Sequence, residues 1–353
     1  MRYSKVRVDA IGCELAPVVV SSVSLEARLA PVYRVLGIKE GQLEAFTGIR
    51  ERRWWEPGFR LSQGAAAAAR KALEGTSVGP SDLGLLVYAG VCRENFEPAT
   101  ACAVAEALGV RGSAAVYDVS NACLGVLNGM VEAANRIELG QARAALVVSA
   151  ESAREINELS IERMLKRPDV DTWKDCLATL TGGSGAVAVL LTDGSFGGSG
   201  HRLLGGVQRA APEHHRICRW GVDPVPGREG AARNAHLTEV MRTDAVAVLK
   251  NGVVLGRRTW EDFLKELGWT PADVDRVVCH QVGSVHQREI LAAFGVPAEK
   301  DFTTFEYLGN IGTVSLPLTA ALAAERGHLE PGHKVGFLGI GSGLNCLMLG
   351  LAW

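Results

Sequence analysis

The chain carries the stretch GPSDLGLLVY at residues 79–88, in which a turn containing proline leads into a short apolar run. A second stretch of the same design, TPADVDRVVC, occupies residues 270–279, about 190 residues further along. Short apolar runs bounded by turn residues are typical of buried strands. Two more pairs of apolar runs keep nearly the same offset, namely Ala144–Ser149 with Val335–Gly339 and Val116–Val119 with Phe302–Phe305. Three strand pairs at nearly one offset predict an internal duplication; the alternative is chance similarity between short runs.

Helical patterns alternate with these strands. They cover Leu61–Leu73, Thr100–Leu108 and Cys123–Leu139 in the first half, and Asp244–Leu267, Ser284–Phe294 and Ser315–Arg326 in the second. Strands that alternate with helices favour an α/β fold with parallel strands and helices on both faces. We therefore predict two fused halves, residues 1–195 and 196–353. A charged helical stretch at about residues 152–181 has no counterpart in the second half, so it is expected to be an insertion that caps the first half.

The composition excludes several classes of protein. The chain has 353 residues, of which 47% are hydrophobic and 22% charged, with a formal net charge of -2. This content excludes disorder and argues against a nucleic-acid-binding surface. The eight cysteines include no C-x-x-C pair, which favours reduced thiols and a cytoplasmic protein. No apolar stretch is long enough to span a membrane, and the residues before Cys13 are too charged for a secretory leader.

Cys123 has the setting of a nucleophile. It follows an apolar strand and a polar turn, and it begins a helical pattern. The positive end of a helix dipole favours a thiolate, so we expect a lowered thiol pKa at this position. The alternative is a small apolar residue that packs under the turn.

His280 and Asn310 are the polar residues in the second half that match this setting. His280 follows the strand that ends at Cys279, and α/β sheets bind ligands at the carboxyl ends of their strands. Asn310 lies in a turn between glycines, at the counterpart of the Cys123 region. A structural histidine and ordinary turn chemistry are the alternatives. The glycine loop GIGSG at residues 339–343 is neither a phosphate-binding loop nor a nucleophile elbow.

Together these segments resemble the thiolase superfamily, and within it the β-ketoacyl-ACP synthase III branch. The resemblance rests on SNACLG at 120–125, CHQ at 279–281, GN at 309–310 and the glycine loop, with TGIRER at 47–52 and LTGGSGA at 180–186. It covers the whole chain and implies a homodimer with a duplicated, five-layered α-β-α-β-α fold and no cofactor or metal. By this resemblance Cys123 takes up an acyl group, and His280 and Asn310 donate hydrogen bonds to an enolate oxygen. The backbone N–H groups of Cys123 and Ser342 would stabilise the tetrahedral intermediates.

The segment RENFEPAT at 93–100 indicates a particular branch of this superfamily. Glu97 stands where synthase III has an aromatic residue, and the segment resembles the OleA family, which joins two long-chain acyl-CoAs. This resemblance implies that Glu97 acts across the dimer interface as the base of a non-decarboxylative, head-to-head Claisen condensation. The product would be a 2-alkyl-3-oxoacyl thioester, released as the β-keto acid. Alternatively, Glu97 is a loop carboxylate held by Arg93 or by a helix N-terminus.

Other functions remain open at this point. One is a ketosynthase that uses malonyl-ACP or joins carrier-bound β-keto chains, with an acyl carrier protein as partner. Another is acyl transfer without formation of a carbon–carbon bond. A non-catalytic partner subunit is disfavoured because Cys123, His280 and Asn310 are all present. Gln42 and Phe46 occupy the positions where synthase III commonly clamps the CoA adenine, so the grip on CoA is not predicted.

Overall fold

The computed structural model describes residues 1–198, 200–224 and 237–353. In this part of the chain, nine strands form one mixed sheet in the order β11-β12-β13-β8-β1-β7-β6-β4-β5. The N-terminal arm of the sheet consists of β1 (Arg7–Leu15), β7 (Gly185–Thr192), β6 (Ala144–Glu151), β4 (Leu83–Tyr88) and β5 (Ala115–Asp118). The C-terminal arm consists of β8 (His201–Ala210), β13 (Asn345–Ala352), β12 (Lys334–Gly341) and β11 (Arg276–Cys279).

The two arms repeat one topology. Outward from the centre, the order β1-β7-β6-β4 corresponds to β8-β13-β12-β11. In both arms the first three strands pair antiparallel, and the next pair, β6–β4 or β12–β11, is parallel. The arms join where β1 pairs with β8 through only two residue pairs, Arg7 with Arg202 and Val8 with His201. The duplication expected from the sequence is thus present in the strand order.

The predicted strand at residues 302–305 is wrong. Asp301 makes a single bridge with Val277, and α11 (Phe305–Leu308) begins directly afterwards. The Oε1 atom of Gln281 accepts hydrogen bonds from the backbone N–H groups of Thr304, at 2.9 Å, and Phe305, at 3.3 Å. Because a side chain takes these donors, the segment turns into a helix instead of extending the ladder.

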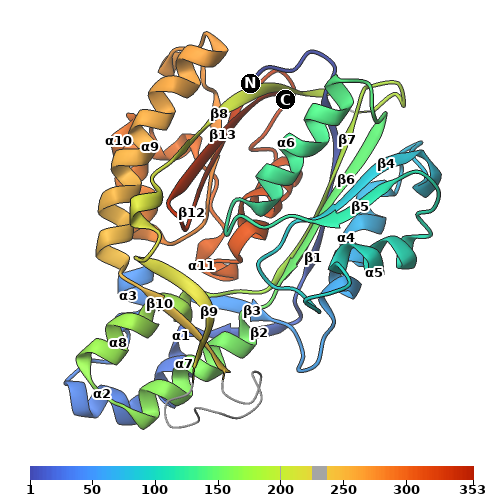
Figure 1. Ribbon diagram of the computed structural model, residues 1–353. Helices are drawn as coiled ribbons and strands as arrows, with labels where there is room; N and C mark the ends of the chain where they lie inside the picture. Colours follow the sequence, from blue (N-terminus) through green and yellow to red (C-terminus); the bar gives the residue numbers. More distant parts are fainter. Residues whose placement is uncertain (199, 225–236) are drawn as a thin grey trace.

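Helices cover both faces of each arm and produce five layers (Figure 1). One outer layer contains α4 (Leu61–Leu73) and α5 (Thr100–Leu108), and the other contains α9 (Ala245–Leu267) and α10 (Ser284–Phe294). The middle layer contains α6 (Gly125–Glu138) and α12 (Ser315–Glu325), which contact strands of both arms. The predicted α-β-α-β-α architecture is confirmed.

Small residues bring α4 close to the sheet. The alanine-rich face of α4 is buried, and a Cβ atom added to Gly12 of β1 would lie 2.2 Å from the backbone oxygen of Ala68. Glycine at this position therefore permits the close packing of helix on strand. The bounds of α4, α5 and α10 coincide with the helices predicted from the sequence.

A cluster of short helices lies at one end of the layers and is called the helical cap below. It contains α1 (Ser22–Arg28), α2 (Ala30–Leu36), α3 (Gln42–Thr47), α7 (Arg154–Lys166) and α8 (Val170–Leu177). The stretch 152–181 is helical as predicted, and α7 and α8 share a core with Leu25 and Tyr33. Two ribbons adjoin the cap, β2 (Val18–Ser21) with β3 (Glu51–Trp54) and β9 (Cys218–Pro224) with β10 (Leu237–Thr243).

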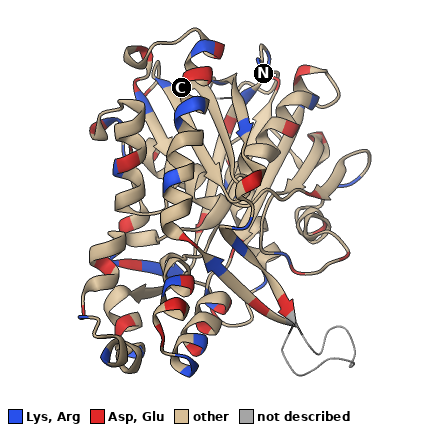
Figure 2. Cartoon of the chain, turned by 60° about the vertical axis from the view of Figure 1, so that its left-hand side comes forward, with Lys and Arg blue, Asp and Glu red and all other residues tan. Residues whose placement is uncertain are grey.

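Charge is concentrated away from the sheet. Figure 2 shows strands of the large sheet with few charged residues, while both signs are mixed over the outer helices and the helical cap. Among the described residues, no helix combines the length and apolar character needed to cross a bilayer.

Candidate active site

Cys123 lies in a turn between β5 and α6. The N–H of Leu124 donates to the oxygen of Asn121 at 2.9 Å, and Ala122 has a positive φ of 46°. A positive φ is costly for a residue with a Cβ atom, so the surrounding structure must hold this turn. The helix itself begins at Gly125, two residues later than the sequence pattern predicted.

The predicted lowering of the Cys123 pKa is wrong. The pKa of this thiol is raised to about 12, mainly by desolvation and to a smaller extent by the neighbouring Cys218 and Glu151, while its own backbone N–H opposes the shift. Desolvation dominates because it removes the hydration of a thiolate, whereas the helix dipole falls off within one turn and α6 starts only at Gly125. The thiol is therefore protonated at rest and must lose its proton during attack.

The glycine loop after β12 meets the Cys123 turn. A Cβ atom added to Gly341 would lie 3.4 Å from the backbone nitrogen of Cys123. The Nδ2 of Asn345 donates to Oδ1 of Asn121 at 3.1 Å, which ties the loop to the turn. Ser342, the next residue in the loop, donates its hydroxyl to Sγ of Cys218 at 3.1 Å. The structure thus brings Ser342 and Cys123 into one region, as expected.

Asn310 is held rigidly on both sides of its backbone. Its N–H donates to the oxygen of Thr181, and its own oxygen accepts from Gly183, both at 2.9 Å. Its side-chain Oδ1 accepts the N–H of Gly312 at 3.0 Å. With Oδ1 occupied, the Nδ2 group is the part of the amide that remains to donate a hydrogen bond to a ligand.

The Asn310 turn also contacts the start of α6. The hydroxyl of Thr313 accepts the N–H of Val126 at 2.6 Å. A Cβ atom added to Gly125 would lie 3.3 Å from the same hydroxyl oxygen. Asn310 and Cys123 therefore occupy neighbouring turns, although they are far apart in the sequence.

His280 follows β11 directly and is 6% exposed. Its backbone N–H donates to the backbone oxygen of Leu338 on β12, the strand whose end lies near Cys123. The pKa of His280 is lowered to about 3, mainly by burial and to a smaller extent by the nearby His286, so the imidazole is neutral near pH 7. The Nδ1 atom is buried with no hydrogen-bond partner in the described residues.

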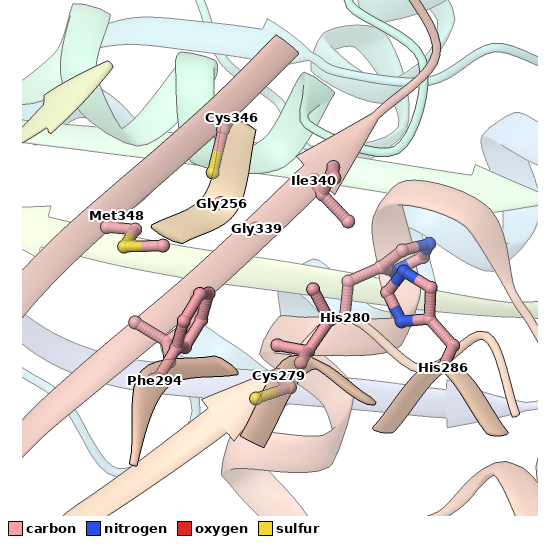
Figure 3. Close-up of a pocket in the computed structure, with 11 residues that line it drawn as sticks. Gly256, Cys279, His280, His286, Phe294, Gly339, Ile340, Cys346 and Met348 are labelled. Carbon is pink, nitrogen blue, oxygen red and sulfur yellow. The ribbon is translucent and has the colours of Figure 1, made fainter. Parts of the chain in front are cut away.

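A small cavity lies beside His280, between β12, β13 and the helices α9 and α10. Its volume is about 20 Å³, roughly the space of one water molecule and much less than an acyl chain. The imidazoles of His280 and His286 lie side by side at one end, and apolar side chains such as Phe294 and Met348 line the rest (Figure 3). Burial also lowers the pKa of His286, to about 4. Two neutral imidazoles thus share this wall.

Glu97 lies apart from the other predicted site residues. It belongs to the segment between β4 and α5, its side chain is exposed, and it forms no hydrogen bond or ion pair with the described residues. Arg93 is also exposed and is not paired with it. The neighbouring Phe96 is fully exposed. Within the described part of one chain, the tip of this loop therefore has no partner.

Sequence reasoning missed three residues that organise the site. Gln281 turns the chain toward Asn310, Thr313 accepts from the first turn of α6, and His286 faces His280. A histidine six residues after His280, at the start of a predicted helix, is a signal that the pattern already contained. The other two act through backbone groups whose positions no sequence pattern reveals.

Comparison with known proteins gives the family. The chain is 54% identical to the acyl-CoA:acyl-CoA alkyltransferase of Shewanella oneidensis, and the match covers 100% of both chains. The chain belongs to the acyl-CoA:acyl-CoA alkyltransferase (OleA) family. It is 36% identical to the Xanthomonas campestris member, again over 100% of both. The crystal structure of cerulenin-bound OleA from that genus superposes with a TM-score of 0.92 at 35% identity, covering 100% of this chain and 98% of the other.

The wider relationship is to β-ketoacyl-ACP synthase III. Residues 264–353 match the family model for the C-terminal part of 3-oxoacyl-[acyl-carrier-protein] synthase III. A Streptomyces coelicolor β-ketoacyl-ACP synthase III is 30% identical over 92% of both chains. The OleA family member described here is therefore an acyltransferase with a thiolase fold, as the sequence predicted.

Proposed function

We propose that the enzyme condenses two acyl-CoA thioesters head to head without loss of carbon dioxide. The observation that carries this proposal is the exposed carboxylate of Glu97, which has no hydrogen-bond or ion-pair partner among the described residues. A decarboxylating ketosynthase makes its enolate by releasing carbon dioxide and needs no strong base, whereas an unactivated acyl thioester must lose an α-proton to a base. The names of the relatives from Shewanella and Xanthomonas support the same reaction.

Acylation is the first step. The Sγ atom of Cys123 attacks the carbonyl carbon of the first acyl-CoA, the carbon–sulfur bond to CoA breaks, and CoA leaves as a thiol that carries the proton lost by Cys123. The N–H groups of Cys123 and Ser342 donate to the oxyanion in between. The contact between Gly341 and the Cys123 nitrogen supports this role, because it brings the two backbone segments together.

Formation of the enolate is the second step. Glu97 takes an α-proton from the second acyl-CoA, and the charge moves to the thioester oxygen. His280 and the Nδ2 group of Asn310 donate to that oxygen. A neutral imidazole suits this role, because it donates an N–H without a proton transfer of its own, and the low pKa of His280 keeps it neutral.

Carbon–carbon bond formation completes the reaction. The α-carbon of the enolate attacks the carbonyl carbon of the acyl-Cys123 thioester, and the bond between that carbon and Sγ breaks. The departing thiolate takes up the proton that Glu97 removed, which regenerates both the thiol and the carboxylate. The product is a 2-alkyl-3-oxoacyl-CoA, whose hydrolysis by water gives the β-keto acid and CoA.

The active enzyme is proposed to be a homodimer in which Glu97 serves the site of the other copy. Two exposed neighbours support this arrangement: Phe96 presents a full aromatic side chain to solvent, and Glu97 has no partner among the described residues of its own chain. An exposed aromatic at a loop tip is a frequent anchor of protein interfaces.

The division at residues 195 and 196 into two thiolase halves, with 152–181 as the capping insertion of the first, is likewise proposed. The repeated strand order supports it. A cytoplasmic location is proposed from the eight free cysteines. The substrates include acyl-CoA, and an acyl carrier protein is a possible second carrier.

The test uses purified protein with myristoyl-CoA alone, and then with malonyl-ACP added, with the products identified by mass spectrometry. We expect a condensed product with two myristoyl chains from myristoyl-CoA alone, and Cys123→Ala provides the blank. A product that forms only when malonyl-ACP is present would contradict the proposal.

That second outcome defines the alternative function, a synthase III-type ketosynthase. The match of residues 264–353 to the synthase III model and the similarity to the Streptomyces enzyme favour it. Both reactions use the same acyl-Cys123 intermediate, so the source of the enolate is the point that separates them.

A further inference from the structure

Glu151 is a buried carboxylate that the proposed mechanism has not used. It is the last residue of β6 and is 4% exposed. The corresponding end of β12 in the C-terminal arm is Gly341, which contacts the Cys123 turn. A charged group at the end of a fully buried strand requires partners that compensate its lost hydration.

Its partners are backbone N–H groups at the base of the segment 89–99 between β4 and α5, which is called the Glu97 loop. The N–H of Val91 donates to Oε1 at 2.8 Å, and the N–H of Cys92 donates to Oε2 at 3.0 Å. Both carboxylate oxygens are therefore used, one for each amide. The hydroxyl of Tyr88 lies between the same elements, 2.8 Å from the oxygen of Cys92 and 2.7 Å from the oxygen of Ala150, and its single proton is shared between these two acceptors.

Glu151 also lies close to the Asn310 turn. A Cβ atom added to Gly312 would lie 3.6 Å from Cγ of Glu151 and 3.7 Å from its Oε1 atom, so the carboxylate borders this glycine. The N–H of Gly312 is the group that occupies Oδ1 of Asn310. One carboxylate thus accepts hydrogen bonds from the base of the Glu97 loop and borders the glycine that orients the Asn310 amide.

We propose that Glu151 is a positioning residue for condensation. Its buried carboxylate fixes the direction in which the Glu97 loop leaves strand β4, and it holds the base of this loop against the Asn310 turn. The inference rests on the proposed function of Glu97 and Asn310. The negative charge of Glu151 also acts on Cys123, because it is one of the influences that raise the pKa of that thiol. Burial raises the pKa of Glu151 itself, and the bonds from Val91 and Cys92 oppose this shift.

The main variant is Glu151→Gln, which keeps size but loses the charge and one acceptor oxygen. Its amide group would face a backbone N–H, so one of the two donors loses its partner. We expect Cys123 to be acylated by acyl-CoA still, while the rate of condensation falls by about 10- to 100-fold more than the rate of acylation, as for a misplaced reacting group. Hydrogen exchange at Val91 and Cys92 should become faster.

A second measurement separates positioning from general destabilisation. Removal of the negative charge lowers the pKa of the Cys123 thiol, so the pH profile of its alkylation by iodoacetamide should move to lower pH in Glu151→Gln. Glu151→Asp keeps the charge but is too short to reach both amides. Glu151→Asp should keep the wild-type alkylation profile and still lose condensation. If Glu151→Gln does not fold, this variant tests the inference in its place.

Glu26→Gln is the matched control. Glu26 is also 4% exposed and accepts the N–H groups of Gly41, at 2.7 Å, and Leu43, at 2.8 Å, but it lies in the helical cap. This variant should be less stable and keep the wild-type ratio of condensation to acylation. An equal loss of that ratio in Glu26→Gln would overturn the inference.

The remaining outcomes are also decisive. A wild-type ratio of condensation to acylation in Glu151→Gln overturns the inference even if the alkylation profile moves. If the wild-type protein forms no condensed product from acyl-CoA alone, the proposed function fails. In that case unchanged hydrogen exchange at Val91 and Cys92 in Glu151→Gln would reject the anchor as well, and faster exchange would support it.

Discussion

The two arms of the sheet carry their candidate residues at corresponding strand ends, but the chemistry of these residues differs. In the N-terminal arm, β4 leads to the exposed Glu97, β5 leads to Cys123, and β6 ends in Glu151. In the C-terminal arm, β11 is the equivalent of β4 and leads directly to His280. The segment after Asp301 leads to Asn310, and β12 leads to the glycine loop. One arm therefore supplies a thiol and carboxylates, whereas the other supplies neutral hydrogen-bond donors.

The arms also differ in how completely they fix their side chains. His280 is buried, and the Oδ1 of Asn310 is held by a backbone N–H, so these donors are oriented within one chain. Glu97 is exposed and has no partner among the described residues, whereas the base of its loop is held by Glu151. The C-terminal half is thus preorganised within the described residues, whereas the N-terminal half is incomplete there, and under the proposed function Glu97 acts on the site of the other copy.

The largest effect is expected at the nucleophile. Cys123→Ala should abolish both acylation and condensation, because no other group would form the thioester. Mass spectrometry of the protein after incubation with acyl-CoA should show one acyl group on the wild-type peptide that contains Cys123 and none in the variant. Cys102→Ala removes an exposed thiol on α5 and should behave as wild type. Acylation at Cys92 or Cys218 in the Cys123→Ala variant would reject the assignment.

The sequence predicted the fold well where local signals agree with tertiary packing. The apolar runs gave β4 and β6, and the alanine-rich run gave α4, because their side chains are buried in the way their periodicity indicates. The strand at 302–305 was wrong because a distant side chain, Gln281, takes its backbone donors. Such a competition is not visible in a local pattern.

The site was predictable as a set of residues but not in its electrostatics. Cys123 and His280 follow the strands β5 and β11, and Asn310 follows the short helix α11 in the turn expected from the sequence. The thiol pKa depends on desolvation and on Glu151, which arrive from other elements. Glu151 itself was hidden because a single acidic residue after a long apolar strand reads as the end of that strand. The hydrogen bonds from the backbone N–H groups of Val91 and Cys92 show which segment Glu151 holds, and they are visible only in the structure.

The next effect tests the incomplete half. Glu97→Gln should leave acylation of Cys123 intact and reduce condensation from acyl-CoA alone by about 10²–10⁴, the range for loss of a positioned general base. In deuterated water, any exchange into the α-carbon of the second acyl-CoA should disappear in the variant. The control is Glu106→Gln, which changes an exposed glutamate on the following helix, α5, and should condense at the wild-type rate. Normal condensation by Glu97→Gln would leave the malonyl-dependent reaction as the better assignment.

Mixed dimers sharpen the same comparison. If Glu97 acts on the other copy, a dimer of one Cys123→Ala chain and one Glu97→Gln chain has one site without both groups and one intact site. Such a dimer should recover about half the wild-type rate. A mixture with no activity above that of the separate variants would mean that Glu97 acts within its own chain or not at all.

A smaller loss is expected in the preorganised half. Asn310→Ala should still be acylated at Cys123, but condensation should fall by about 10²–10³, the usual cost of one oxyanion donor. His280→Ala should show the same separation of the two steps. Quenched-flow measurement of CoA release together with product formation distinguishes them. Unchanged condensation in either variant would remove that residue from the enolate site.

The smallest expected effect is on stability, and it comes from the paired imidazoles beside the cavity. The pKa of His286 is about 4 in the folded protein and about 6.5 in an unfolded chain. Below pH 6.5 the unfolded chain therefore binds a proton that the folded protein does not, and stability falls as the pH decreases toward 4. Between pH 7 and pH 5 this single group should lower the free energy of unfolding by about 1–2 kcal/mol.

His286→Phe removes the titrating group while it keeps an aromatic ring in the cavity wall. Urea unfolding at pH 7 and pH 5 should show a smaller loss of stability on acidification in this variant than in the wild type, by about 1–2 kcal/mol. His215→Gln changes an exposed histidine and should keep the wild-type pH response. An equal loss of stability in His286→Phe and the wild type would mean that His286 is protonated in the folded protein. In that event a positive charge would face His280, and the C-terminal arm would no longer be the half built from neutral donors.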